Sequence, residues 1–130
     1  MILTIRTDNP EAEVGLYDGQ TQISYYVWHA DRKLATELLG VIRDELKKQH
    51  AAWADITEVI VYKGPGSFTG LRIGITVADS IAYGNHIPIV GTQGNDWIAT
   101  GTKRLAAGET DTLVLPHYGA EANITISKKK

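Results

Sequence analysis

The spacing of apolar residues changes near residue 30 from that of strands to that of a helix. Residues 2–5 form a short apolar run, and residues 12–17 alternate apolar with polar side chains. Residues 23–28, after the turn at Asp18-Gly19, are rich in aromatic and β-branched side chains, which favour strands. From residue 34 to 46, apolar residues recur at spacings of three and four, as in an amphipathic helix. This order predicts a three-stranded antiparallel meander followed by a helix from Asp31, its expected N-cap, to Lys48.

The rest of the chain alternates strands with helices. An antiparallel opening followed by such alternation predicts an α/β fold, in which helices pack on a mixed sheet. The further predicted elements are a buried strand at 56–62, a helix from the following glycine-rich loop to about 83, a strand at 87–90, a helix at 95–105 and a last strand at 112–115.

Composition limits the class of protein. The 130 residues suffice for one core but are few for a two-lobed enzyme, so we expect one lobe over residues 1–115 and a polar tail over 116–130. The 13 Lys and Arg against 15 Asp and Glu argue against unaided nucleic-acid binding, which draws on clustered cations. The lack of cysteine excludes disulfides, thiolate metal sites and a Cys nucleophile. With no signal-like or membrane-spanning run in the sequence, we expect a cytoplasmic protein without membrane contact.

The most informative segment is the glycine-rich loop KGPGSFTG, residues 63–70, between a predicted strand and a predicted helix. It lacks the Lys-Ser/Thr pair of a Walker phosphate loop, and its glycines do not match the dinucleotide-binding fingerprint. A simpler interpretation is that the glycines form a tight turn while Ser67 caps the helix.

Two glycines in the following helix require a second explanation. Gly70 and Gly74 are four residues apart and so lie on one side of the helix. Because glycine within a helix costs up to about 1 kcal/mol relative to alanine, a close contact is expected to compensate. Another helix is the obvious contact, either within the chain or from a second chain.

The string KGPGSFTGLRIGIT, residues 63–76, resembles the signature of the TsaB (YeaZ) family, in which a strand leads into GPGSFTG and an alanine-rich helix. The similarity covers most of the chain, but only this segment is strongly diagnostic. It continues in Ala78, Ala82, Gly84 and residues 88–91, and more loosely at residues 2–5, 32–39, 116–119 and 122–125.

The resemblance implies an actin-like N-terminal lobe (ASKHA, ribonuclease H-like) in a non-catalytic subunit. In that family the subunit supports TsaD, which holds the metal and performs the transfer, and works with the ATPase TsaE to make threonylcarbamoyladenosine (t6A) in tRNA. We therefore expect a scaffold that binds a TsaD-like subunit and reaches a TsaE-like ATPase and tRNA only through the complex. It is also expected to form a homodimer when alone and to bind no cofactor or metal.

The same resemblance places the family interface on the helix after the glycine loop. We therefore expect the partner to bind through the helix Ser67 to Tyr83 and its neighbour, Asp31 to Lys48. No catalytic residue is assigned. The expected partner-binding and homodimer residues are Gly66, Ser67, Phe68, Thr69, Gly70, Leu71, Arg72, Gly74, Ile75, Val77, Ala78 and Ile81.

Two departures from the family pattern bear on function. Relatives often carry an Asp-Thr pair at the end of the first strand, where this chain has Arg6-Thr7, and a cation there would repel magnesium. Asp8 nevertheless keeps open an alternative, an independent nucleotide-binding or ATP-hydrolysing actin-like enzyme. Typical members also carry a second lobe, so this chain is expected to keep mainly the first.

The other polar candidates have simpler interpretations. The four histidines lack the HxxxH or HExxH spacing of a metal site and are expected at the surface or in turns. Ser67 lacks the G-x-S-x-G context of a nucleophile. Asp79 and Arg72 fit either an interface role or the solvated side of a helix.

Overall fold

The chain opens with the expected antiparallel meander. The computed structural model describes residues 1–117, in which β1 (Ile2–Arg6), β2 (Glu11–Asp18) and β3 (Thr21–His29) pair in succession. The turn between β2 and β3 contains Gly19, whose φ of 59° suits a residue without a Cβ. The meander therefore confirms the first part of the predicted architecture.

Two parallel strands complete a five-stranded mixed sheet. β4 (Glu58–Tyr62) pairs with β1, and β5 (Ile89–Thr92) pairs with β4, which gives the order β3-β2-β1-β4-β5. Both strands begin two residues later than predicted. Ile56 nevertheless remains in the core, 1% exposed, because it follows the 3-10 turn Trp53–Asp55 that leads into β4.

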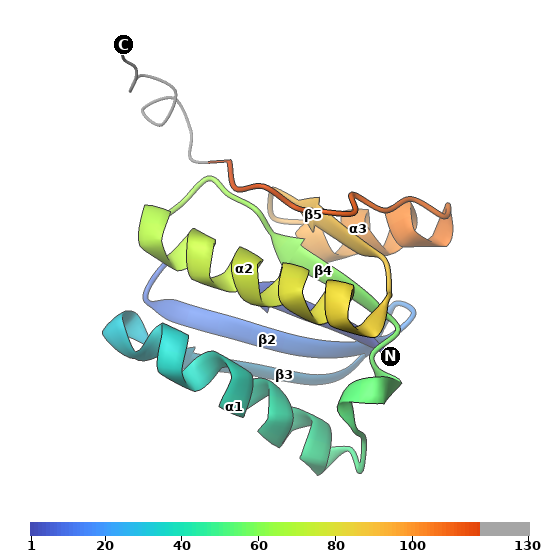
Figure 1. Ribbon diagram of the computed structural model, residues 1–130, viewed down its shortest axis with the longest axis horizontal. Helices are drawn as coiled ribbons and strands as arrows, with labels where there is room; N and C mark the ends of the chain where they lie inside the picture. The colour runs from blue at the N-terminus through green and yellow to red at the C-terminus, as the bar shows by residue number, and fades with distance from the viewer. Residues whose placement is uncertain (118–130) are drawn as a thin grey trace.

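Helices cover both faces of this sheet (Figure 1). α1 (Leu34–Lys48) and α2 (Phe68–Asn85) lie side by side on one face, and α3 (Trp97–Ala106) packs on the other face against β4 and β5. In α3, Gly101 lies against Ile60 and the Trp97 ring meets the Tyr62 ring edge-on at 6.0 Å between centroids. The α/β class with a mixed sheet and packed helices is thus confirmed.

The core lies mainly between the sheet and the α1–α2 layer. A buried carboxylate also ties α1 to β3, since Glu45, 4% exposed, accepts a hydrogen bond from Ser24 and pairs with Lys48 at 2.7 Å. The large fully buried side chains are Leu3, Ile5, Val14, Leu16, Leu38, Ile42, Leu46, Ile56, Val59, Ile60, Leu71 and Ile89.

The predicted N-cap at Asp31 is wrong. Asp31 starts a 3-10 turn, Asp31–Lys33, with φ of 47°, and α1 begins only after it, with Lys33 at the capping position. From the helical spacing of its apolar residues, α2 is expected to bury Phe68, Leu71, Ile75, Ala78 and Ala82. The last four are buried, whereas Phe68, in the first turn, is 53% exposed.

The last predicted strand, Thr112–Leu115, does not form either. The segment runs beside β5, but side chains accept hydrogen bonds from the backbone N–H groups of β5 that a further paired strand would need. Thr110 accepts the N–H of Ile89 at 3.2 Å, and Asp111 accepts the N–H of Gly91 at 2.8 Å. Val114 alone of this segment is buried. The tail expected over 116–130 lies mostly outside the described residues.

Candidate functional site

The glycine-rich loop joins β4 to α2 at the carboxyl end of β4 and is fastened to the end of β1. The N–H of Ser67 donates to the carbonyl of Asp8 at 2.8 Å, and the Tyr62 hydroxyl donates to the carbonyl of Pro65 at 3.1 Å. Ser67 does occupy the N-cap position of α2, but its hydroxyl forms no capping hydrogen bond. The loop is therefore held by its backbone rather than by the serine side chain.

The close contact expected for the glycines of α2 is internal. A Cβ built on Gly70 would overlap the carbonyl oxygen of Thr7, and one built on Gly74 would overlap the Thr7 side chain. The Thr7 hydroxyl, buried with its residue at 1% exposure, donates to the carbonyl of Gly70 at 2.7 Å. The element that approaches is thus the end of β1 and neither a helix nor a second chain.

The structure divides the expected interface residues into three groups. Leu71, Gly74, Ile75 and Ala78 are buried within the chain itself, so their side chains are not available to a partner. Gly66, Ser67, Phe68, Thr69 and Arg72 are exposed, and Gly70, Val77 and Ile81 are partly exposed. Gly66, like Gly70, faces inward, because a Cβ there would overlap that of Asp8.

A surface groove runs between α1 and α2, and five of its residues were not singled out from the sequence: Ala35, Leu39, Ile73, Thr76 and Ser80. Its main hollow measures about 380 Å³. Ile73, Thr76 and Ser80 could have been found from the outward row of α2, which continues from Thr69 at helical spacing, whereas Ala35 and Leu39 lie on α1. We call this the α1–α2 groove and define it by Ala35, Leu39, Thr69, Arg72, Ile73, Thr76, Val77, Ser80 and Ile81.

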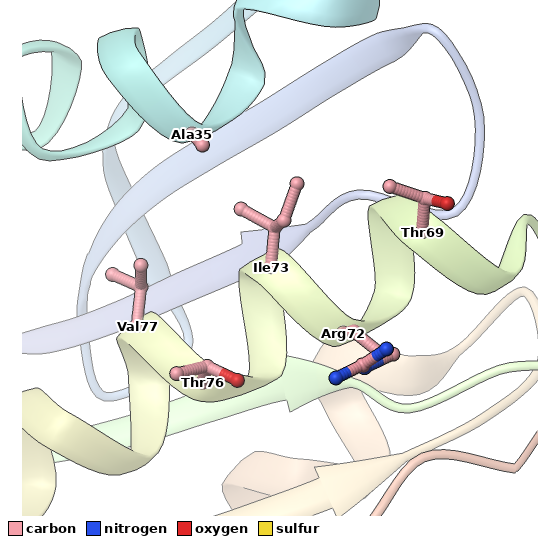
Figure 2. Close-up of a pocket in the computed structure, with 6 residues that line it drawn as sticks. All are labelled: Ala35, Thr69, Arg72, Ile73, Thr76 and Val77. Carbon is pink, nitrogen blue, oxygen red and sulfur yellow. The ribbon is translucent and has the colours of Figure 1, made fainter.

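Figure 2 shows the main hollow of this groove. Thr69, Ile73 and Val77 project from α2 toward the side on which Ala35 of α1 lies. Arg72 and Thr76 project from the flank of α2 that faces away from Ala35. The guanidinium of Arg72 lies over the Phe68 ring, 5.4 Å from its centroid. The groove thus has an apolar floor and one cationic border.

The carboxylate nearest the end of β1 is engaged by a neighbouring cation. Arg6 donates to both carboxylate oxygens of Asp8, at 2.8 and 3.2 Å, and lies over the Tyr62 ring at 4.0 Å. The hydrogen bonds to Asp8 raise the pKa of Arg6 in spite of partial burial. Asp8 is therefore paired within the chain rather than presented to a nucleotide.

The remaining polar candidates serve the chain's own structure. Asp79 accepts the N–H of Val114 at 2.9 Å, and partial burial raises its pKa in spite of this bond. His29 pairs with Glu11 at 2.8 Å, while His50 and His86 adopt positive φ next to helix ends. Within residues 1–117 we find no cluster of three His, Asp or Glu side chains that could hold a metal ion. None of the helices described there is long and apolar enough to span a bilayer.

Comparison with known proteins gives consistent matches. The family model described as TsaD, tRNA N6-adenosine threonylcarbamoyltransferase, matches residues 28–117. The tRNA threonylcarbamoyladenosine biosynthesis protein TsaB of Bacillus subtilis is 29% identical over 92% of this chain and 50% of its own length. TsaB of Escherichia coli is 31% identical over 79% of this chain and 44% of its own length. The chain thus spans about half the length of these relatives.

Solved structures agree with the sequence matches. YeaZ from Pseudomonas aeruginosa superimposes with a TM-score of 0.60 at 26% identity, over 71% of this chain and 44% of its own. A second Pseudomonas aeruginosa structure, described as similar to peptidase YEAZ, gives a TM-score of 0.66 at the same identity and covers 71% of this chain and 42% of its own. The chain therefore belongs to the family that the TsaD model describes and, within it, to the TsaB (YeaZ) proteins with an actin-like fold.

Proposed function

We propose that the chain is a non-catalytic scaffold of the t6A modification machinery, which binds a TsaD-type catalytic subunit through the α1–α2 groove in the cytoplasm. The observation that carries the proposal is the second apolar row of α2. One row, with Leu71 and Ile75, fills the core, while Ile73 and Val77 line an open groove. Apolar surface that the chain leaves in a groove is typical of a docking site. The t6A context comes from the names of the TsaB relatives.

The scaffold role is supported by the polar groups around the glycine loop. The Asp8 carboxylate is bound by Arg6, and the Asp8 carbonyl accepts the N–H of Ser67. These groups fasten β1 to the start of α2, which gives the groove a fixed floor. We assign the transfer of the threonylcarbamoyl group to the partner.

The wider assembly follows from this assignment. A TsaE-like ATPase and the tRNA are reached through the complex, because a chain with 13 basic and 15 acidic residues has no excess of cations for phosphate. When no partner is present, a second copy occupies the groove and forms a homodimer. The triplet Lys128 to Lys130 lies outside the described residues.

Isothermal calorimetry with the TsaD-like protein of the same organism tests the proposal. The variant is Thr76→Trp, because Thr76 is exposed and a large side chain there obstructs the groove without disturbing the core. The matched control is Lys103→Trp, at an exposed position of α3 on the other face of the sheet. We expect wild type and Lys103→Trp to bind alike and Thr76→Trp to bind at least tenfold more weakly.

A cellular measurement extends the test to function. In cells depleted of their own TsaB, t6A measured by mass spectrometry of digested tRNA is expected to recover with Lys103→Trp and not with Thr76→Trp. Absence of binding by wild type would refute the proposal. Equal binding by the two tryptophan variants would show that the partner binds elsewhere than in the α1–α2 groove.

A further inference from the structure

We propose that β3 pairs in antiparallel orientation with β3 of a second copy of this chain, so that two five-stranded sheets join into one continuous sheet. The inference goes beyond the proposed function, because it concerns an edge of the sheet. No residue of β3 lines the α1–α2 groove, so the two surfaces are separate.

The two edge strands of the sheet differ in what covers their outward backbone groups. Figure 1 shows β3 at one edge and, at the other, β5 with the segment after α3 beside it. On β5, the N–H groups of Ile89 and Gly91 donate to side chains of that segment. The carbonyls of the same two residues accept hydrogen bonds from Asp111 and Arg104. On β3, by contrast, the backbone hydrogen bonds formed within residues 1–117 are those of the ladder with β2, so this edge is bare.

The sequence of β3 lacks the features that usually prevent edge-to-edge pairing. Charged side chains and proline commonly protect an edge strand. Residues 21–28 contain neither, and His29, which ends the strand, is paired with Glu11. Tyr26 and Val27 are 40% and 49% exposed, so apolar surface accompanies the outward backbone groups. β3 thus offers both the hydrogen bonds and the apolar contacts that a further strand requires.

Side chains of α1 hold β3 in place. Ser24 donates a hydrogen bond to the buried carboxylate of Glu45. The indole N–H of Trp28 donates to Glu37 at 3.2 Å. A strand that is already ordered loses little conformational freedom when it pairs, which favours association.

The occupant is a second copy because β3 is complementary to itself. An uncharged strand meets its own copy without like-charge repulsion, and Lys48, which lies over Tyr26, is already paired with Glu45 at 2.7 Å. Because the outward groups of β5 are covered, each copy has one edge to offer. Pairing through β3 therefore closes as a two-fold dimer and does not continue as a fibre.

The register of the dimer follows from the regular part of β3. Ile23 has no partner in β2, since the register shifts there, so the regular part begins at Ser24. Side chains directly opposite each other lie on the same face of a sheet, and the two-fold axis must therefore pass through a residue. The strand pairs over most of its regular part when this residue is Tyr26 or Val27.

Sedimentation velocity over a concentration series tests the inference. The full chain carries Thr76→Trp, which obstructs self-association through the groove, and we expect a dimer to remain. Val27→Lys and Val27→Glu should each weaken this dimer about tenfold or more, because each places two like charges near the axis. An equimolar mixture of the two should associate again, which damage to the fold would not allow. Ala106→Lys, at an exposed position of α3, is the matched control and should leave the dimer unchanged.

A cross-link then locates the axis. The chain contains no cysteine, so a disulfide in a single-cysteine variant joins two copies. Under mild oxidation, Tyr26→Cys or Val27→Cys should form the linked dimer, whichever residue lies at the axis, and Ala106→Cys should not.

Three results would overturn the inference: a monomer at every concentration, a dimer that Val27→Lys leaves unchanged, or a mixture of the charged variants that stays apart. Equal cross-linking of all three cysteine variants would do the same. None of these results bears on binding in the groove. Failure of the wild-type chain to bind the TsaD-like protein would refute the proposed function alone.

Discussion

At the scale of single residues, Gly74 determines how closely α2 approaches β1. Glycine within a helix is unfavourable, so Gly74→Ala would raise helix propensity by about 1 kcal/mol if the new methyl group had room. It has none, because the Cβ would overlap the side chain of Thr7, which is itself fixed by its hydrogen bond to Gly70. We therefore expect Gly74→Ala to lower the free energy of unfolding by about 1–3 kcal/mol, measured by urea denaturation.

The same helix supplies the control. A Cβ built on Gly84 meets nothing within 4 Å, so Gly84→Ala should raise the free energy of unfolding by up to about 1 kcal/mol. Equal effects of the two substitutions would contradict the internal contact. A leucine at position 74 would likewise act through folding, and is therefore unsuited as a probe of the partner interface.

Arg6 and Asp8 decide between a scaffold and an independent ATPase. Because Arg6 occupies both carboxylate oxygens of Asp8, we expect no ATP turnover by the isolated chain with magnesium, measured as phosphate release. Turnover that Arg6→Ala preserves and Asp8→Asn abolishes would establish the enzyme instead.

These residues also show how far sequence reasoning reaches. The spacing of Gly70 and Gly74 correctly predicts a close approach, because glycine in a helix needs a compensating contact. It cannot name the contact, since Thr7 is 63 residues away from Gly70 and only the parallel pairing of β1 with β4 brings the two together. Helical spacing places Ile73 and Thr76 on the outward side of α2, but it does not show that α1 lies beside them and forms a groove, because that contact is long-range.

At the scale of elements, the segment after α3 is held on β5 by side chains. Arg104 donates to Asp111 through two nitrogens and to the Gly91 carbonyl at 3.2 Å. The apolar residues at 112–115 predict a strand. In the structure, however, the N–H groups of Ile89 and Gly91 at the edge of β5 donate to the side chains of Thr110 and Asp111. Side chains that compete for backbone groups in this way are not visible in hydrophobic spacing.

This fastening predicts a pH-dependent contribution from Asp111. Partial burial alone would raise the pKa of Asp111, but the hydrogen bonds from Arg104 and the N–H of Gly91 outweigh it and lower the pKa below 3.8. A lowered folded-state pKa stabilises the fold above the unfolded-state value, and this stabilisation is lost as the pH falls through the folded-state pKa. Asp111→Asn should thus cost about 1.5–3 kcal/mol at pH 7, with the difference from wild type shrinking below about pH 4.

Asp79, which holds the same segment through Val114, supplies the contrast. Its pKa is raised by burial, so its ionised form is disfavoured in the fold, and acidification favours the folded state at this residue. Asp79→Asn should therefore cost less than Asp111→Asn at pH 7, and the wild-type advantage over it should grow as the pH falls. Urea unfolding, followed by tryptophan fluorescence at several pH values, measures the free energy of unfolding of both variants. If the loss of stability relative to wild type changed with pH in the same direction for both variants, these assignments would be contradicted.

At the scale of the whole molecule, the α1–α2 layer has two functions. Its inner surface completes the core of the lobe, and its outer surface forms the groove. Because Thr7, Gly70 and Gly74 fix α2 against β1, the outer row cannot turn inward to cover its own apolar residues. The burial that stabilises the lobe therefore also keeps the groove, the proposed docking surface, on the outside of the molecule.

Arg72 is the charged member of the nine residues that define the groove, and within residues 1–117 it forms no ion pair, so one substitution there is expected to act oppositely on two assemblies. In the proposed complex, a TsaD-like chain that offers a carboxylate to Arg72 is expected to bind more weakly after Arg72→Gln. In a homodimer formed groove to groove, the groove supplies no carboxylate, and covering two guanidinium groups costs free energy that neutral glutamine reduces. Arg72→Gln should therefore tighten self-association, measured by sedimentation velocity over a concentration series, while Lys103→Gln changes neither assembly. A homodimer that Arg72→Gln weakens would show that a second copy does supply a carboxylate from outside the groove.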